Sequence, residues 1–336
     1  MSLPIAYDLY LTKEWANDPE RRKRAGIPEQ IEFRNKIQIA LGQINWAVNA
    51  GVDLGVISAD AAYGNDTDFR DELTTLGLRY CVAIHETTTV WEPGKGPLPP
   101  KKRGPRGREP FRLQRSERHK PVTVKELAQS LPGESFRTVA WREGAKGELS
   151  SRFAAVRVRP AHRDHLRREP RPEEWLLVEW PLGERAPTNY WLSTLPRRTS
   201  RKRLVYFAKI RWRIERDYEE LKQETGLGHY EGRKWRGFHH HAAMCIAVYG
   251  FLVAERGLFS QKDVGYQPRF KKFAISGSPR PDAPAITAGT SQSDFHRNFA
   301  QRIGRGERAP ASTLPLLSPD SRHDGGRVLK SFSIFT

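Results

Sequence analysis

Three ionisable side chains, Arg211, Glu215 and Lys222, stand at helical spacing within residues 201–224. If the segment is helical, at about 100° per residue, they share one narrow stripe. The apolar edge that would dock this helix lies beside the stripe and consists of Ile210, Ile214 and Leu221. A charge beside a protein core is costly unless it is paired or bound to a metal. The spacing therefore fits a salt-bridged amphipathic helix or a functional site in which one carboxylate stands among basic residues.

A second carboxylate, Asp60, follows a short apolar run that begins near Val56. This run, a helix that Asp66 or Thr67 can cap, and a further apolar run over 78–84 form a strand, helix, strand unit. Such a unit indicates parallel strands, and open α/β sheets bind ligands outside the carboxyl ends of their strands. Asp60 would stand at such an end. Its side chain could equally cap a turn.

The residues around these carboxylates resemble those of insertion-sequence transposases of the DDE superfamily. Arg211, Glu215 and Lys222 match the R, E and K of the Y-R-E-K signature of that family. Two segments, GLGHYEGR and WRGFHHH, resemble sequences of one bacterial branch of the family. A third segment, ADAAYG, resembles the family motif that carries the second catalytic Asp. The Tyr of the signature would fall at Ala208, while the nearby Tyr206 would face elsewhere on the helix.

The resemblance implies a catalytic site of three acidic residues that binds Mg²⁺ or Mn²⁺. Asp60 would be the second of these residues and Glu215 the third, and both would be metal ligands. The residues that would contact DNA are Arg211, Lys222, Tyr218, Arg233 and Arg236. In the family the first Asp lies on a strand upstream of the segment that matches residues 5–11. We therefore expect the chain to begin after that strand, to bind DNA and to cut it poorly.

The composition indicates a soluble protein that binds nucleic acid. The 336 residues carry a formal charge of +18, and 38% of them are hydrophobic, which is enough for domains with buried cores. Basic residues cluster at 101–120 and 197–203, either as solvated loops or as contacts to a DNA backbone.

Cys81 and Cys245 lie in separate apolar runs, as reduced core residues do. No run of 18 apolar residues and no signal-peptide pattern is present. We therefore expect no membrane partner and a cytoplasmic, nucleoid-associated location.

The order of the expected elements indicates an α/β fold. By resemblance it is an RNase H-like mixed sheet with flanking helices, interrupted by a β-rich insertion. The insertion is predicted from four strand-like runs, at 135–142, 149–159, 174–180 and 188–195. Helices are expected over 29–50, 122–131, 201–224 and 238–256, and a short strand over 1–11. The expected domains are 1–91 (first part of the core), 92–196 (basic loop and insertion), 197–257 (helical return with Glu215) and 258–336 (a basic, disordered tail).

The three histidines His239, His240 and His241 resemble a metal cluster only in composition. Successive helical residues point about 100° apart, so these side chains cannot converge on one ion from a helix. We expect them to pack in a core or to contact DNA.

The leading functional hypothesis is a DDE transposase. Its partners would be DNA, at the transposon ends and the target, and a second copy of the chain in a synaptic complex. Two alternatives stay open: an inactive remnant that only binds DNA, and a basic RNA-binding or structural protein. In the last case Asp60 and Glu215 are ordinary members of ion pairs.

Overall fold

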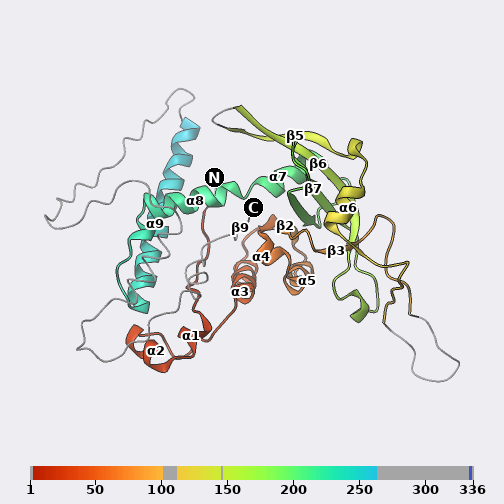
Figure 1. Ribbon diagram of the computed structural model, residues 1–336. Helices are drawn as coiled ribbons and strands as arrows, with labels where there is room; N and C mark the ends of the chain where they lie inside the picture. Colours follow the sequence, from red (N-terminus) through yellow and green to blue (C-terminus); the bar gives the residue numbers. More distant parts are fainter. Residues whose placement is uncertain (1–2, 101–111, 145–146, 263–332, 335–336) are drawn as a thin grey trace, which may run out of the picture. The chain divides into compact units, whose positions relative to one another are not determined.

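The computed structural model describes residues 3–100, 112–144, 147–262 and 333–334 (Figure 1). Contacts divide the chain into two units, one of residues 1–36 and 216–330 and the other of residues 37–215 and 331–336. Two predictions lie partly outside the described residues: the basic cluster at 101–111 and the tail at 263–332.

The second unit is built on a mixed sheet. Its strands are β1 (Val56–Ala59), β2 (Arg79–Ile84), β3 (Thr89–Trp91), β4 (Val122–Thr123), β5 (Arg137–Gly144), β6 (Gly147–Pro160), β7 (Glu174–Glu179), β8 (Asn189–Ser193) and β9 (Ser333–Ile334). They are ordered β4-β3-β6-β7-β8-β2-β1-β9, and β5 pairs with β6 beside this row. β1 and β2 are parallel, whereas β8 pairs with β2 in antiparallel fashion. The β-rich residues therefore continue the sheet that β1 and β2 begin.

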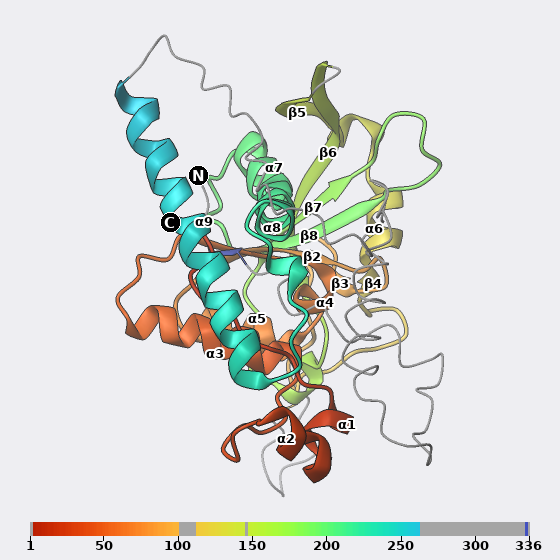
Figure 2. The ribbon, with the colours of Figure 1, turned by 90° about the vertical axis from the view of Figure 1, so that its left-hand side faces the viewer.

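Helices cover both faces of this sheet (Figures 1 and 2). They are α3 (Lys36–Asn49), α4 (Ala61–Gly64), α5 (Thr67–Thr75), α6 (Val124–Ser130), α7 (Arg201–Lys209) and the first turn of α8 (Trp212–Gln223), with short 3₁₀ turns η1 (Gly133–Ser135) and η2 (Asp164–Leu166). α3 and α5 lie on one face and α7 lies on the other.

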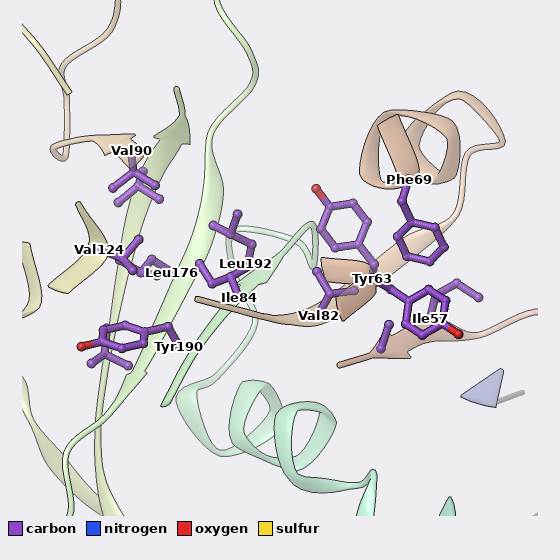
Figure 3. Close-up of a cluster of buried hydrophobic side chains, with 14 of the residues drawn as sticks. Ile57, Tyr63, Phe69, Val82, Ile84, Val90, Val124, Leu176, Tyr190 and Leu192 are labelled. Atoms are coloured by element: carbon purple, nitrogen blue, oxygen red, sulfur yellow. The ribbon is translucent and has the colours of Figure 1, made fainter. Parts of the chain in front are cut away.

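Alternating side chains bury both faces of the strands. Ile57 and Val82 point into the core under α3 and α5 (Figure 3). Their neighbours Val56 and Cys81 point into a second core against α7. Burial on both faces explains why these strands are apolar at nearly every position, and each fully buried aliphatic side chain stabilises the fold by about 1.5–3 kcal/mol.

The other unit is helical in its described part. Its elements are α1 (Lys13–Ala16), α2 (Pro19–Ala25), the later turns of α8, η3 (Leu227–His229) and α9 (Trp235–Lys262). One face of α9 packs through Ala242, Cys245 and Tyr249 against Leu221 and Leu227. The remaining surface of α9 is also largely apolar, and Met244 and Phe251 are exposed there.

Within the described residues, one helical segment, 235–257, is long and apolar enough to cross a membrane, with 17% of its most apolar window buried in the structure. Length and composition alone do not distinguish such a span from a helix that packs against protein. The absence of a membrane partner stays a prediction.

The structure confirms the predicted α/β class, a mixed sheet with flanking helices as in an RNase H-like fold. The strand, helix, strand unit is present as β1, α5 and β2, and Asp66 caps α5 by accepting from the Phe69 N–H at 2.8 Å. The four predicted runs are β5 to β8. Cys81 and Cys245 are buried and free.

The strand predicted over residues 1–11 is wrong for its described part, which has no regular secondary structure. Side-chain contacts hold this segment instead. The Tyr7 hydroxyl donates to the His239 carbonyl at 3.0 Å, and Asp8 pairs with Arg34. A strand needs a neighbour to satisfy its backbone groups, and the sequence around residue 8 could not show that none would pair.

The helix predicted over 29–50 begins later, at Lys36. Gly26 ends α2 with a left-handed φ of 67°, and the Ile31 N–H then donates to the Pro28 carbonyl at 3.1 Å. The Gly and Pro residues therefore make a helix end followed by a turn, and α3 starts only after it.

The helix predicted over 201–224 is interrupted between α7 and α8. At the interruption, the N–H groups of Arg213 and Ile214 bond to the carbonyls of Ile210 and Arg211 at 3.0 Å each. Bonds to the third preceding residue tighten the chain into a 3₁₀ turn. The predicted stripe is therefore not carried by one continuous helix, and Arg211 precedes α8.

At Gly64, α4 lies directly against the backbone of β2. A Cβ atom at Gly64 would stand 2.0 Å from the carbonyl oxygen of Ala83, which is backbone and cannot move aside alone. We expect Gly64→Ala to lower the free energy of unfolding by about 1–3 kcal/mol, measured by urea denaturation. At Gly133 a Cβ would meet nothing within 4 Å, so Gly133→Ala should change stability by less than about 0.5 kcal/mol. Equal stability of the two variants would contradict this account.

Candidate functional site

Asp60 stands at the carboxyl end of β1, where the chain turns into α4. Its Oδ1 accepts a hydrogen bond from the Ala62 N–H at 3.0 Å, so the side chain caps α4. Its Oδ2 lies 3.8 Å from a terminal nitrogen of Arg211, and the side chain is 31% exposed. The capping alternative raised by the sequence is therefore observed, and one oxygen of the same carboxylate still faces a basic residue.

The residues after Asp60 fix this end of the sheet. All four residues of β1 are buried, and Gly64 lets α4 lie directly on the β2 backbone. Asn65 then joins α4 to the loop after β2, because its Oδ1 accepts from the His85 N–H and from the Thr88 hydroxyl, each at 2.9 Å. The strand ends are thus tied to one another by backbone and amide contacts.

Sequence reasoning missed the part played by Asn65. The only feature of the sequence that pointed to Asn65 was its position directly after the glycine of the ADAAYG segment. Asn is frequent in turns because its side chain bonds to nearby backbone, but its bonds here reach about twenty residues along the chain to the loop after β2. That partner could not be inferred without knowing that β1 and β2 are neighbours.

Arg211 reaches Asp60 from the turn between α7 and α8. Their separation of 3.8 Å is too long for a hydrogen bond, and both side chains are partly exposed, so the pair stabilises the fold by about 0–1 kcal/mol. The Nε of Arg211 is buried and has no hydrogen-bond partner among the described residues. This guanidinium therefore keeps unused donor capacity next to a carboxylate.

Glu215 follows Arg211 by one helical turn, with the Glu215 N–H donating to the Arg211 carbonyl at 3.3 Å. Its side chain is exposed in the first turn of α8. The structure thus brings the side chains of Asp60 and Arg211 together. Glu215 is linked to Arg211 by a backbone hydrogen bond. The convergence of the Asp60 and Glu215 carboxylates stays a prediction.

The donor set suits a hard divalent cation. Asp60 and Glu215 offer carboxylate oxygens, which Mg²⁺ and Mn²⁺ prefer, and Mg²⁺ retains several water ligands where the protein supplies few. Within the described ranges, no group of three or more His, Cys, Asp or Glu side chains is arranged to hold a metal ion. A two-carboxylate site that also uses water and phosphate oxygens is compatible with these residues.

The other predicted DNA contacts belong to the first unit. Lys222 lies with its Nζ 4.3 Å from the centre of the Tyr218 ring, and burial raises the pKa of Tyr218 to about 12. Tyr218 therefore stays neutral and packs beside Leu221. Arg233 and Arg236 are exposed, and their charges are available to a partner.

Two of the three histidines pack as expected. The ring of His239 lies 4.3 Å from that of Trp235, and burial lowers the pKa of His239. His241 lies with its Nε2 3.0 Å from the Gly226 carbonyl, while His240 is exposed. These different surroundings agree with side chains that diverge around α9.

Comparison with known protein families gives a match. Residues 1–148 match a family model described as DDE superfamily endonuclease, which confirms the superfamily that the motifs resemble and indicates a domain of transposase or nuclease type. The matched part contains Asp60 and ends before α7. No curated protein matches the chain. The Y-R-E-K assignment of Arg211, Glu215 and Lys222 stays a prediction.

The two roles of Asp60 can be separated by substitution. Asp60→Ala removes the cap of α4 and should lower the free energy of unfolding by about 1 kcal/mol, whereas Asn caps as well as Asp. Asp60→Asn should therefore keep nearly the stability of the original chain in urea denaturation. Asp53 is exposed, so Asp53→Ala serves as the control and should have little effect. If Asp60→Asn is as unstable as Asp60→Ala, the cap is not what the carboxylate contributes.

Proposed function

Because residues 1–148 carry a DDE superfamily endonuclease domain, we propose that this chain is an insertion-sequence transposase. It binds DNA and uses divalent metal ions to cut and transfer DNA strands. Its partners are transposon-end DNA, target DNA and a second copy of the chain. We propose the bacterial cytoplasm, at the nucleoid, as its location.

One observation supports this proposal most directly. Arg211 and Asp60 come from motifs far apart in the sequence, and their side chains lie 3.8 Å apart. The basic residue that we assign to the R-E-K signature therefore lies near the Asp60 carboxylate at the end of β1. The nearness of these two side chains supports the proposal that both motifs serve one site.

The chemistry assigns a separate role to each side chain. Bound divalent ions would activate the attacking oxygen and stabilise the leaving oxygen of a phosphodiester. Asp60 and Glu215 would hold those ions through carboxylate oxygens. Arg211 would bind a phosphate of the DNA end with its guanidinium, whose planar donors match phosphate oxygens.

The weak pairing of Arg211 with Asp60 fits this division of roles. Without other ligands, each side chain partly neutralises the other. A phosphate offers Arg211 a better acceptor than a carboxylate 3.8 Å away. When Arg211 turns to a phosphate, the Asp60 Oδ2 becomes available as a metal ligand while Oδ1 continues to cap α4.

The remaining basic residues supply the backbone contacts. We propose that Lys222, Arg233 and Arg236, together with the cluster at 197–203, bind DNA phosphates, and that the Tyr218 ring supports Lys222. Phosphate contacts position a protein on DNA and carry no sequence information. They therefore explain the charge of the chain without naming the terminal repeat.

The cleavage test uses variants that keep shape and remove charge. We expect the chain to nick a supercoiled plasmid in Mg²⁺ or Mn²⁺, because the two assigned carboxylates offer the oxygen ligands that these ions prefer. Asp60→Asn and Glu215→Gln should each lower the nicking rate by about 100-fold or more, since small misplacement of the reacting groups is costly. The rate is measured on agarose gels over hours, with EDTA as the metal-free reference.

Matched controls remove equivalent charges elsewhere in the chain. Asp53→Asn and Glu219→Gln should nick as the unaltered chain does, because both carboxylates are exposed and stand outside the proposed site. Nicking that survives both Asp60→Asn and Glu215→Gln would refute the site. DNA binding with no nicking under any metal would favour the alternative of a remnant that only binds DNA.

A further inference from the structure

Two neighbouring elements of the second unit each begin with an arginine. Arg137 is the first residue of β5 and Arg201 is the first residue of α7. Arg137 is exposed and Arg201 is half-buried. Within the described residues, neither side chain has an acidic partner or a hydrogen bond. They are therefore two charges that the fold leaves unneutralised.

α7 runs along β5 in the same direction, beneath the β5–β6 hairpin (Figure 1). Two contacts fix this alignment. The Nζ of Lys209 lies 4.7 Å from the Trp141 ring, and the Arg142 guanidinium lies 4.1 Å from the Trp212 ring. The later residues of one element thus meet the later residues of the other.

The alignment brings the two arginines to the same end of the α7–β5 interface. From Lys209 back to Arg201 an α-helix covers about 12 Å, and from Trp141 back to Arg137 a strand covers about 13 Å. Arg201 also lies one turn before Leu204 and Val205, on the face of α7 that packs in the core shared with β5. Both guanidinium groups therefore come to the same end of the α7–β5 interface.

This pair differs from three other basic side chains of the unit. Lys209 pairs with Glu179 at 2.6 Å, Arg115 pairs with Asp164, and Arg171 pairs with Asp71. In each case a carboxylate offsets the charge, as expected for partly buried cations. Arg137 and Arg201 have each other in place of a carboxylate.

Keeping two like charges together costs free energy. Burial, and then the charge of Arg137, lower the pKa of Arg201. A bound anion would remove this cost, and a phosphodiester oxygen pair matches the donor geometry of a guanidinium.

We propose that Arg137 and Arg201 clamp one backbone phosphate of DNA between β5 and α7, at a site separate from the Asp60 carboxylate. The clamp rests on the proposed function, because a DNA-cutting chain has duplex DNA as its ligand. It needs no metal ion and reads no base. Its role is to position the duplex while Arg211 engages a phosphate near the carboxylates.

The test measures DNA binding without metal. A labelled 40-base-pair duplex of arbitrary sequence is titrated with the full chain in EDTA over a range of salt concentrations. Each neutralised phosphate contributes about 0.9 to the slope of log affinity against log salt. We expect Arg137→Ala/Arg201→Ala to lower the magnitude of that slope by about 0.9. Each single variant should lose nearly as much affinity as the double variant, because both side chains hold the same phosphate.

The matched control removes the same charge elsewhere. Arg79 and Arg185 are exposed in the same unit, so Arg79→Ala/Arg185→Ala should leave the slope unchanged. An equal fall in the control would show a general charge effect, and additive losses in the two single variants would show two independent contacts. Either result overturns the clamp.

Two further measurements distinguish the clamp from a structural role and from RNA binding. The melting temperatures of the Arg137 and Arg201 variants should equal or exceed that of the original chain, since removing a like charge relieves repulsion. A clear fall would assign these residues a structural role instead. Tighter binding to duplex RNA of the same length, lost in the double variant, would overturn the assignment to DNA.

Failure of the clamp and failure of the proposed function give different results. If the chain nicks DNA but the double variant keeps its salt slope, the clamp is wrong and the nuclease assignment stands. If the salt slope of the double variant falls as expected but no metal supports nicking by the original chain, the clamp stands and the catalytic assignment is wrong.

Discussion

The close approach of Gly64 to the carbonyl of Ala83 decides where the proposed catalytic carboxylate stands. Only a residue without a Cβ atom allows α4 to lie on the β2 backbone at this distance. With α4 held there, the chain must leave β1 at Asp60, and the side chain accepts from the first turn of α4 at 3.0 Å. The position of this carboxylate is therefore set by backbone packing. A side chain fixed by its surroundings is what a catalytic site requires.

The two cores of the sheet bring the basic residues to that position. Because successive strand residues point to opposite faces, Ile57 packs towards α3 and α5 while Val56 packs towards α7. Leu204 and Ala208 pack α7 against the core that contains Val56. The turn that follows α7 then carries Arg211 to Asp60. A hydrophobic pattern thus determines which charges meet, although no apolar residue takes part in the proposed chemistry.

Local patterns predicted much of the fold, and long-range contacts account for the errors. The strand, helix, strand unit around Asp60 and the four later strands were predictable because alternation and capping residues are local signals. The irregular segment at Tyr7 and Asp8 was not predictable, because contacts with residues distant in sequence hold it. Tyr7 contacts His239, and Asp8 contacts Arg34. For the same reason, sequence could name Arg201 as basic but could not place it beside Arg137. That placement depends on how α7 aligns with β5.

Asp60 shows how one carboxylate serves the fold and remains available for chemistry. Its Oδ1 is committed to the Ala62 N–H, and its Oδ2 faces a guanidinium at 3.8 Å. The first contact is short and fixes the orientation of the group. The second is long and partly exposed, so it is easily exchanged. A carboxylate with one fixed and one exchangeable contact can change its ionic partner without losing its place in the structure. Structural and chemical roles are therefore divided between the two oxygens of a single side chain.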